Sequence, residues 1–132
     1  MRPHLPVTPP AAGFVLAALL ALAACGGPPA PDAAYRAVPQ GDADRGRVLF
    51  ARYQCGRCHA VPDAPSASIT VAPPLEAFGE RSYIAGRVPN RPDTLQRWLQ
   101  APQSLVPETT MPDLGVSAED ARDLAAYLLS LS

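Results

Sequence analysis

The sequence contains no lysine, and arginine supplies all 11 of its basic side chains against 12 acidic ones. The formal net charge is therefore −1 at pH 7. Proteins that bind nucleic acid usually present a strongly basic surface, so this charge balance argues against a nucleic-acid partner. Histidine and methionine are also scarce, with two of each. This scarcity limits which side chains could act as ligands of a metal ion.

The chain also lacks an apolar run of the roughly 20 residues that a membrane-spanning helix needs. Its most hydrophobic stretch, residues 11–24, is shorter than that, carries no charge and ends in small residues. A short polar start with Arg2 and His4 precedes it. This arrangement is typical of a removable export signal. We therefore expect residues 1–24 to be a signal peptide and the mature protein to be exported.

Three cysteines are present, an odd number that needs an explanation in an exported protein. The segment Leu22–Cys25 resembles the lipobox of bacterial lipoproteins, whose cysteine is lipidated and becomes the mature N-terminus. The resemblance implies a protein anchored to a membrane through lipid on Cys25 and facing the periplasm or the cell exterior. Residues 25–41 are rich in proline, glycine and alanine, and we expect them to form a tether. The alternative is ordinary cleavage, which leaves a soluble protein with an unpaired thiol.

Residues 42–132 are expected to form one all-α domain, because apolar residues recur at helical spacing in three segments. The expected helices run from Asp42 or Ala43 to about Gln54, from Pro92 to a stop at Pro102, and from the cap residue Ser117 towards the C-terminus. The last helix has one apolar face, made of Ala121, Leu124, Ala125, Leu128 and Leu131. A short helical turn is expected within residues 78–85. No segment shows the alternating pattern of a strand.

Residues 55–59 (CGRCH) form a C-x-x-C-H motif at the end of the first expected helix. Two thiols at this spacing can form thioether bonds to a haem, and the adjacent imidazole can ligate the iron from one face. A zinc site would need four ligands, of which the mature chain offers three strong candidates. A thioredoxin-like site would need a βαβ pattern, which the sequence lacks. The motif therefore predicts one covalent haem c bound through Cys55, Cys58 and His59.

The second axial ligand of the iron has few candidates. Met1 and His4 fall within the expected signal peptide, so the mature chain keeps one methionine, Met111, and one histidine, His59. Water and tyrosine are the alternatives to Met111. Because Met111 lies in a polar loop beside a proline, before the last helix, we predict that it ligates the iron. The competing interpretation is a methionine that fills a gap in the core.

With these features the sequence is similar to the class I cytochrome c family over residues 41–132. The matching residues are Gly46 and Phe50 in the first helix, the C-x-x-C-H motif, Pro73-Pro74-Leu75, Thr110-Met111-Pro112, and Leu124 and Tyr127 in the last helix. The resemblance implies the cytochrome c fold, in which the first and last helices cross around one haem. It also implies that Gly46 lets the two backbones approach and that Phe50 and Tyr127 pack at the crossing.

The resemblance also implies roles for residues around the haem. The Pro74 carbonyl would accept a hydrogen bond from Nδ1 of His59, and Leu75 would pack on the haem. The candidates to bind haem propionates or other carboxylates are Trp98, Arg81, Tyr83 and Arg87. Core packing for the tryptophan and a solvated surface for the arginines remain open alternatives. The usual Gly-Pro-x-Leu of the family stands here as APPL, residues 72–75, so the local backbone also remains open.

Charged residues gather in two segments of the expected domain. Four arginines lie in or near the first helix and the motif, and three acids open the last helix: Arg45, Arg47, Arg52, Arg57, Glu119, Asp120 and Asp123. A solvated surface is the expected place for both groups, although such an asymmetry could also orient a redox partner.

An iron with ligands on both faces leaves no position for a substrate, which favours electron transfer over catalysis. We expect no enzyme, but a protein that carries single electrons between donor and acceptor proteins of the respiratory chain, as a monomer or within a complex. A dedicated electron-transfer subunit of a larger oxidase or dehydrogenase is the first alternative. A haem peroxidase or gas sensor, in which Met111 leaves the iron, is the second.

Overall fold

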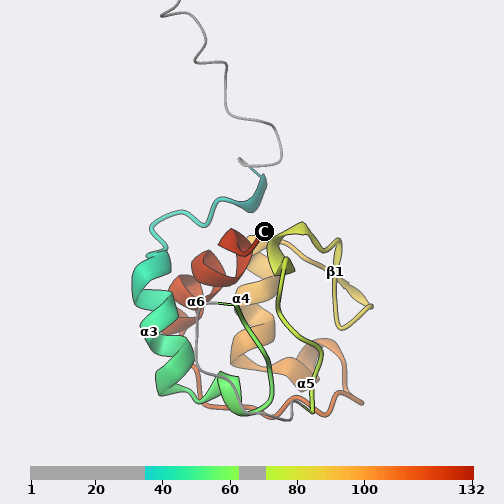
Figure 1. Cartoon of the computed structure of the whole chain (residues 1–132). Helices are drawn as coiled ribbons and strands as arrows, with labels where there is room; N and C mark the ends of the chain where they lie inside the picture. The colour runs from blue at the N-terminus through green and yellow to red at the C-terminus, as the bar shows by residue number, and fades with distance from the viewer. Residues whose placement is uncertain (1–34, 63–70) are drawn as a thin grey trace, which may run out of the picture. The chain divides into compact units, whose positions relative to one another are not determined.

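The computed structural model describes residues 35–62 and 71–132 (Figure 1). These residues belong to the second of the two units into which the chain divides, Pro31–Ser132. The expected signal peptide, Cys25 and most of the expected tether lie outside the described residues. The predictions made for them therefore stay predictions.

Helices dominate the described part of the chain. In chain order the elements are α3 (Ala43–Arg52), η2 (Cys55–Arg57), η3 (Phe78–Glu80), β1 (Tyr83–Ile84), β2 (Val88–Pro89), α4 (Pro92–Gln100), α5 (Pro102–Leu105) and α6 (Ala118–Ser130). This architecture confirms the all-α class (Figure 1). The antiparallel pair β1–β2 is an addition to the expected fold. Strands of two residues are too short to show an alternating sequence pattern.

The helix boundaries follow the capping residues seen in the sequence. The Asp42 side chain accepts a hydrogen bond from the Arg45 N–H at 2.9 Å, and the Ser117 hydroxyl accepts one from the Asp120 N–H at 3.1 Å. Pro92 is the first residue of α4, where its missing N–H leaves no hydrogen bond unmade. Pro102 follows the end of α4 as expected, but it also begins the short helix α5.

The first and last long helices cross at very short range (Figure 1). A Cβ atom added to Gly46 in α3 would lie 2.1 Å from the carbonyl oxygen of Asp123 in α6. Only glycine therefore fits at this position without moving the two backbones apart. The rings of Phe50 and Tyr127 meet edge to face beside it, with centroids 5.9 Å apart and an interplanar angle of 67°. This geometry agrees with the helix crossing that the resemblance implies.

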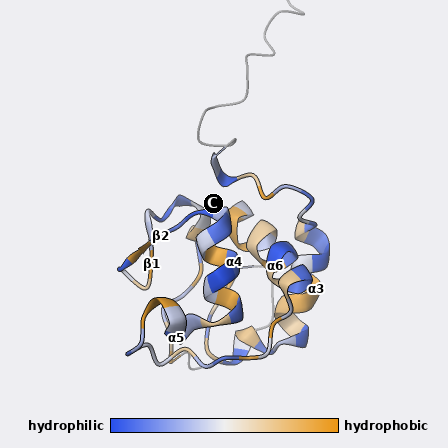
Figure 2. Cartoon of the chain, turned by 180° about the vertical axis from the view of Figure 1, so that it is seen from behind, coloured by the Kyte–Doolittle hydropathy of each residue, from blue (hydrophilic) through white to orange (hydrophobic). Residues whose placement is uncertain are grey.

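The buried apolar residues of the helices form one shared core. Figure 2 shows that hydrophobic and hydrophilic residues alternate along these helices. The face expected for α6 is buried, including Leu131 directly after the helix. In α4 the buried residues are Leu95, Trp98 and Leu99, which recur at the spacing of successive helical turns. Before α3, Val38 packs against this core and the Arg91 guanidinium lies over the ring of Tyr35. The last residues of the expected tether therefore contact the domain.

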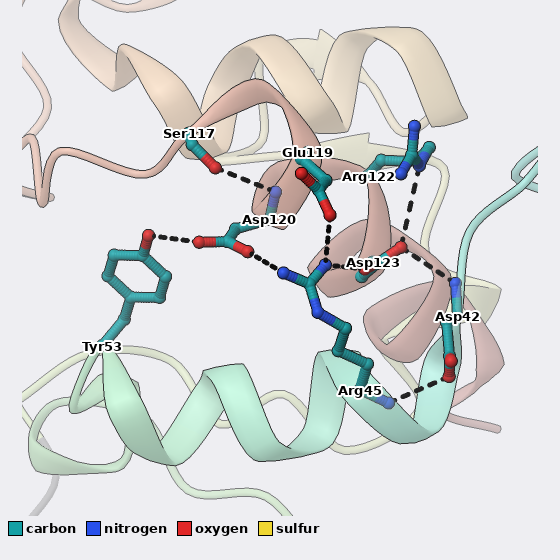
Figure 3. A network of polar contacts seen from close by, with 8 residues as sticks. All are labelled: Asp42, Arg45, Tyr53, Ser117, Glu119, Asp120, Arg122 and Asp123. Carbon is teal, nitrogen blue, oxygen red and sulfur yellow. Dashed lines mark hydrogen bonds and ion pairs between the residues drawn. The ribbon is translucent and has the colours of Figure 1, made fainter.

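A polar network joins α3 to α6 (Figure 3). Arg45 of α3 contacts both Asp120, at 2.7 Å, and Asp123. Asp123 also accepts a hydrogen bond from the Asp42 N–H at 3.0 Å. Asp120 and Asp123 are only 8% and 2% exposed. The solvated surface expected for these two acids is therefore wrong, because they pair across the helix crossing.

The structure also bears on membrane insertion. In residues 35–62 and 71–132, no helix combines the length and the apolarity that crossing a bilayer requires.

Candidate haem site

A cavity of about 480 Å³ opens beside the C-x-x-C-H motif. Its lining comes from distant parts of the described chain and is mainly apolar. Among the lining residues are Phe50, Cys55, Cys58, His59, Leu75, Phe78, Arg81, Leu95, Trp98, Leu99, Met111, Leu124 and Leu128. The volume lies within the range of cofactor and ligand pockets in proteins. The fold therefore gathers most of the site residues expected from the sequence around one space.

The motif leaves α3 through a sharp turn. Gln54 has the left-handed φ of 57°, and Cys55 then begins the tight turn η2. The backbone N–H groups of Cys58 and His59 both donate to the Cys55 carbonyl, at 3.1 and 3.0 Å. This turn brings both cysteines and the histidine to the cavity wall.

Burial raises the pKa of the Cys55 thiol to about 11. Catalytic and redox-active cysteines have lowered pKa values, because the thiolate is the reactive form. The environment of Cys55 therefore does not favour a thioredoxin-like dithiol reaction. It suits a cysteine whose sulfur is buried against an apolar group.

His59 is oriented by a backbone carbonyl. Its Nδ1 lies 2.7 Å from the carbonyl oxygen of Pro73. Because a carbonyl can only accept, Nδ1 carries the hydrogen and Nε2 keeps a free lone pair for a metal ion. The prediction that Pro74 supplies this carbonyl is wrong. The Pro74 oxygen instead accepts a hydrogen bond from Nη2 of Arg81 at 2.5 Å.

The segment that carries Pro73 pairs with the end of the motif. The Ala72 N–H donates to the Cys58 carbonyl at 3.1 Å, and the Leu75 N–H donates to the Ala60 carbonyl at 2.7 Å. These two bonds hold the segment beside His59. They also bring Leu75, which is 8% exposed, to the cavity wall.

Met111 approaches the same cavity from the loop between α5 and α6. Its carbonyl accepts a hydrogen bond from Nε2 of Gln103 at 2.7 Å, and its N–H donates to the Thr109 hydroxyl at 3.2 Å. Both bonds restrict the backbone of the loop at this residue. The sequence carries no signal for the role of Gln103, because glutamines on a helix are usually solvated.

Arg81 and Trp98 also line the cavity. Nη2 of Arg81 donates to the carbonyls of Pro74 and Glu76, and its guanidinium lies 5.7 Å from the centre of the Phe78 ring. Trp98 is 6% exposed. Both positions are compatible with the propionate contacts that the resemblance implies.

The other two propionate candidates lie elsewhere. Tyr83 is 57% exposed in β1, and Arg87 pairs with Glu108 at 2.8 Å. Neither residue lines the cavity. Asn90, directly after β2, connects this hairpin to the cavity wall, and nothing in the sequence indicated this role. Nδ2 of the buried Asn90 donates to the carbonyls of Phe78 and Arg81, each at 3.0 Å.

Among residues 35–62 and 71–132, no three histidine, cysteine or acidic side chains come together in a way that could hold a metal ion.

Comparison with known proteins gives one family and several relatives. The profile of the family described as cytochrome c matches residues 43–132. Proteins named cytochrome c oxidase subunit 2 from Alkalihalophilus pseudofirmus, Bacillus subtilis and Bacillus sp. (strain PS3) are 40%, 31% and 37% identical over 90, 96 and 93 residues. The matches cover 67%, 70% and 67% of this chain but 25%, 27% and 26% of the relatives. The chain therefore spans about a quarter of their length.

Proposed function

Because the chain belongs to the cytochrome c family, we propose that it carries single electrons between membrane-associated redox proteins of a respiratory chain. The cofactor is haem c, attached covalently, as membership of this family implies. The observation that supports the proposal best is the convergence on one cavity of the two motif cysteines, an oriented histidine and a methionine.

The cavity fits this cofactor. Its lining is mainly apolar, as the porphyrin is, and both motif cysteines reach it. We assign the two thioether bonds to Cys55 and Cys58. His59 presents Nε2 because Nδ1 is bonded to Pro73, and Nε2 would serve as one ligand of the haem iron. Met111 lines the same cavity and would supply the second protein ligand of the iron.

The bound haem supplies a one-electron couple between Fe(II) and Fe(III). The hydrogen bond from His59 to Pro73 fixes the orientation and the tautomer of the imidazole ring. The thioether of Met111 raises the reduction potential relative to other axial ligands. Buried side chains such as Leu75 and Trp98 exclude water from the cavity, which disfavours the additional positive charge of the oxidised state. An iron held by both His59 and Met111 would keep no position for a substrate.

Carbon monoxide binding separates electron transfer from the peroxidase or gas-sensor alternative. The reduced protein should bind carbon monoxide slowly or not at all, because Met111 must first leave the iron. The variant Met111→Ala opens that position and should bind the gas rapidly, which shows that the assay works. Rapid binding by the unchanged protein would contradict the proposal and favour a sensor or peroxidase.

A second candidate function is that of a dedicated subunit of a cytochrome c oxidase. The names of the three relatives favour it, since each is a subunit of that enzyme. Purification from native membranes in a mild detergent distinguishes the two functions. Oxidase subunits that co-purify in fixed ratio would support the subunit, whereas a haem protein that migrates alone would support the carrier.

We also propose a lipid anchor on Cys25, in a protein that is exported and faces the periplasm or the cell exterior. The support is the segment Leu22–Cys25 and the apolar stretch before it. Cys25→Ser should move the protein from the membrane fraction to the soluble fraction while its haem stays bound. A variant that remained fully in the membrane fraction would exclude the anchor.

A further inference from the structure

Tyr53 lies at the junction between α3 and the haem-binding motif. It caps the C-terminal end of α3, and its N–H donates to the Leu49 carbonyl at 2.8 Å. The next residue, Gln54, takes the left-handed conformation and turns the chain directly into Cys55. The position of the Tyr53 side chain is therefore tied to that of the first cysteine of the motif.

The Tyr53 hydroxyl bonds to a buried carboxylate of α6 (Figure 3). It donates to Oδ2 of Asp120 at 2.7 Å, and Nη2 of Arg45 donates to Oδ1 at the same distance. Asp120 is 8% exposed, and the hydrogen bond from Tyr53, with the nearby Arg45, lowers its pKa despite this burial. Asp120 therefore stays ionised near neutral pH. Its bond to Tyr53 is of the stronger, charge-assisted kind.

Asp120 also lies in the first turn of α6, directly after the loop that carries Met111. After Met111 the loop makes a turn in which the Gly115 N–H donates to Oδ1 of Asp113 at 2.8 Å. It then reaches Ser117, whose hydroxyl accepts from the Asp120 N–H and so caps α6. The loop is thus anchored to the same helical turn that holds the Tyr53 hydroxyl.

Tyr53 and Met111 border one space. A second cavity of about 210 Å³ is lined by both of them, together with Cys55, Cys58 and His59. We propose that the Tyr53–Asp120 hydrogen bond fixes the position of the haem-binding motif relative to the Met111 loop. Tyr53 and Asp120 are then positioning residues for His59 and Met111, the ligands of the iron. This inference rests on the axial role of Met111 proposed above.

Tyr53→Phe and Asp120→Asn, alone and combined, test the inference in the full-length protein with its haem. The measurement is the rate at which added imidazole replaces Met111 in the oxidised protein. The exchange is monitored through the loss of the absorption band in the red that a thioether-ligated ferric haem shows. Each single variant should exchange about tenfold faster, because a hydrogen bond to a charged group is lost. The double variant should exchange no faster than Asp120→Asn, since both changes remove the same bond.

Asp123→Asn is the matched control for stability alone. Asp123 shares Arg45 with Asp120, but its other partner is the Asp42 N–H, at the opposite end of α3 from Tyr53. This variant should lower the thermal unfolding midpoint at least as much as Asp120→Asn and leave imidazole exchange near the unchanged rate. Glu119→Gln removes an exposed carboxylate of the same network and should change neither quantity.

Three outcomes would overturn the inference. Unchanged exchange rates in Tyr53→Phe and Asp120→Asn would show that the bond does not position the ligands. Equal acceleration in Asp123→Asn would show that it acts only through stability. If the unchanged protein lacked the thioether band, the axial assignment of Met111 would fail first, and the positioning role would fail with it.

Discussion

The α3–α6 crossing and the walls of the cavity are held together by different means. At the crossing, protein atoms pack closely, since Gly46 has no room for even one more carbon atom. Around the cavity, apolar side chains line the space that we propose for the haem, and single hydrogen bonds such as that from Gln103 to the Met111 carbonyl hold the loops. Changes at the crossing should therefore act on stability. Changes at the cavity should act on haem binding and redox properties.

The largest effect should follow from removing both motif cysteines. Cys55→Ser combined with Cys58→Ser removes the thioether bonds, so the apolar cavity walls lose the covalent group on which they pack. We expect no stable haem protein to accumulate, measured by haem content and far-UV circular dichroism. Cys25→Ser is the matched control and should keep its haem. A folded double variant with tightly bound haem would contradict the dependence of the cavity region on covalent attachment.

Gly46→Ala should be the most destabilising small change at the crossing. The new Cβ would lie 2.1 Å from the Asp123 carbonyl oxygen, so α3 and α6 must separate. We expect the free energy of unfolding to fall by about 3 kcal/mol, as measured by chemical denaturation, with little change in reduction potential. Gly86→Ala is the control, because its Cβ would meet no atom within 4 Å and only its φ of +66° is unfavourable. It should cost about 1 kcal/mol. Equal costs would argue against close packing at the crossing.

Met111→Ala should show the opposite pattern, with a changed redox centre and a largely intact fold. Loss of the thioether ligand should lower the reduction potential by about 0.1 V or more, measured by redox titration. The haem should stay attached through Cys55 and Cys58. Leu114→Ala, in the same loop and lining the second cavity, should leave the potential nearly unchanged. An unchanged potential in Met111→Ala would remove this residue from the iron.

The smallest predicted effect is the loss of thermal stability at acid pH that arises from the two buried aspartates at the crossing, Asp120 and Asp123. The pKa of Asp120 is lowered by the Tyr53 hydroxyl, and the pKa of Asp123 is lowered by the Asp42 N–H and Arg45, which outweigh the effect of its burial. The stabilisation by these two charged carboxylates is therefore complete well above pH about 4, the ordinary pKa of aspartate in an unfolded chain. It is lost as the pH falls below about 4 towards the lowered pKa values of the folded state.

Thermal unfolding at a series of pH values tests this contribution. Asp123→Asn should be less stable at neutral pH and should lose less further stability between pH about 5 and 3. Asp44→Asn, an exposed change on α3, should follow the unchanged protein. An identical acid dependence in Asp123→Asn would show that this carboxylate does not contribute.

Local sequence patterns predicted much of the fold and site. Asp42 and Ser117 mark helix starts because capping depends on residues within one turn. The apolar face of α6 follows from helical spacing alone. The C-x-x-C-H motif places three functional side chains within five positions, so their approach to one cavity needs only a single turn of chain.

Features that depend on distant contacts were missed or assigned wrongly. Burial of Asp120 and Asp123 arises only when α6 meets Arg45 of α3, and the sequence indicates merely that charges are present. The choice between the carbonyls of Pro73 and Pro74 depends on backbone directions that a run of two prolines does not reveal. The resemblance to the family indicated which segment bonds to His59, but not which carbonyl oxygen of that segment accepts the hydrogen bond.

The central claim is that the motif cysteines bind one haem covalently, in the cavity that also contains His59 and Met111. The most direct test is the mass of the acid-denatured protein, purified from cells that assemble covalent haem, together with its absorption spectrum. We predict the polypeptide mass plus that of one haem, which persists after denaturation because thioether bonds survive unfolding. A polypeptide mass with no attached porphyrin would contradict the account.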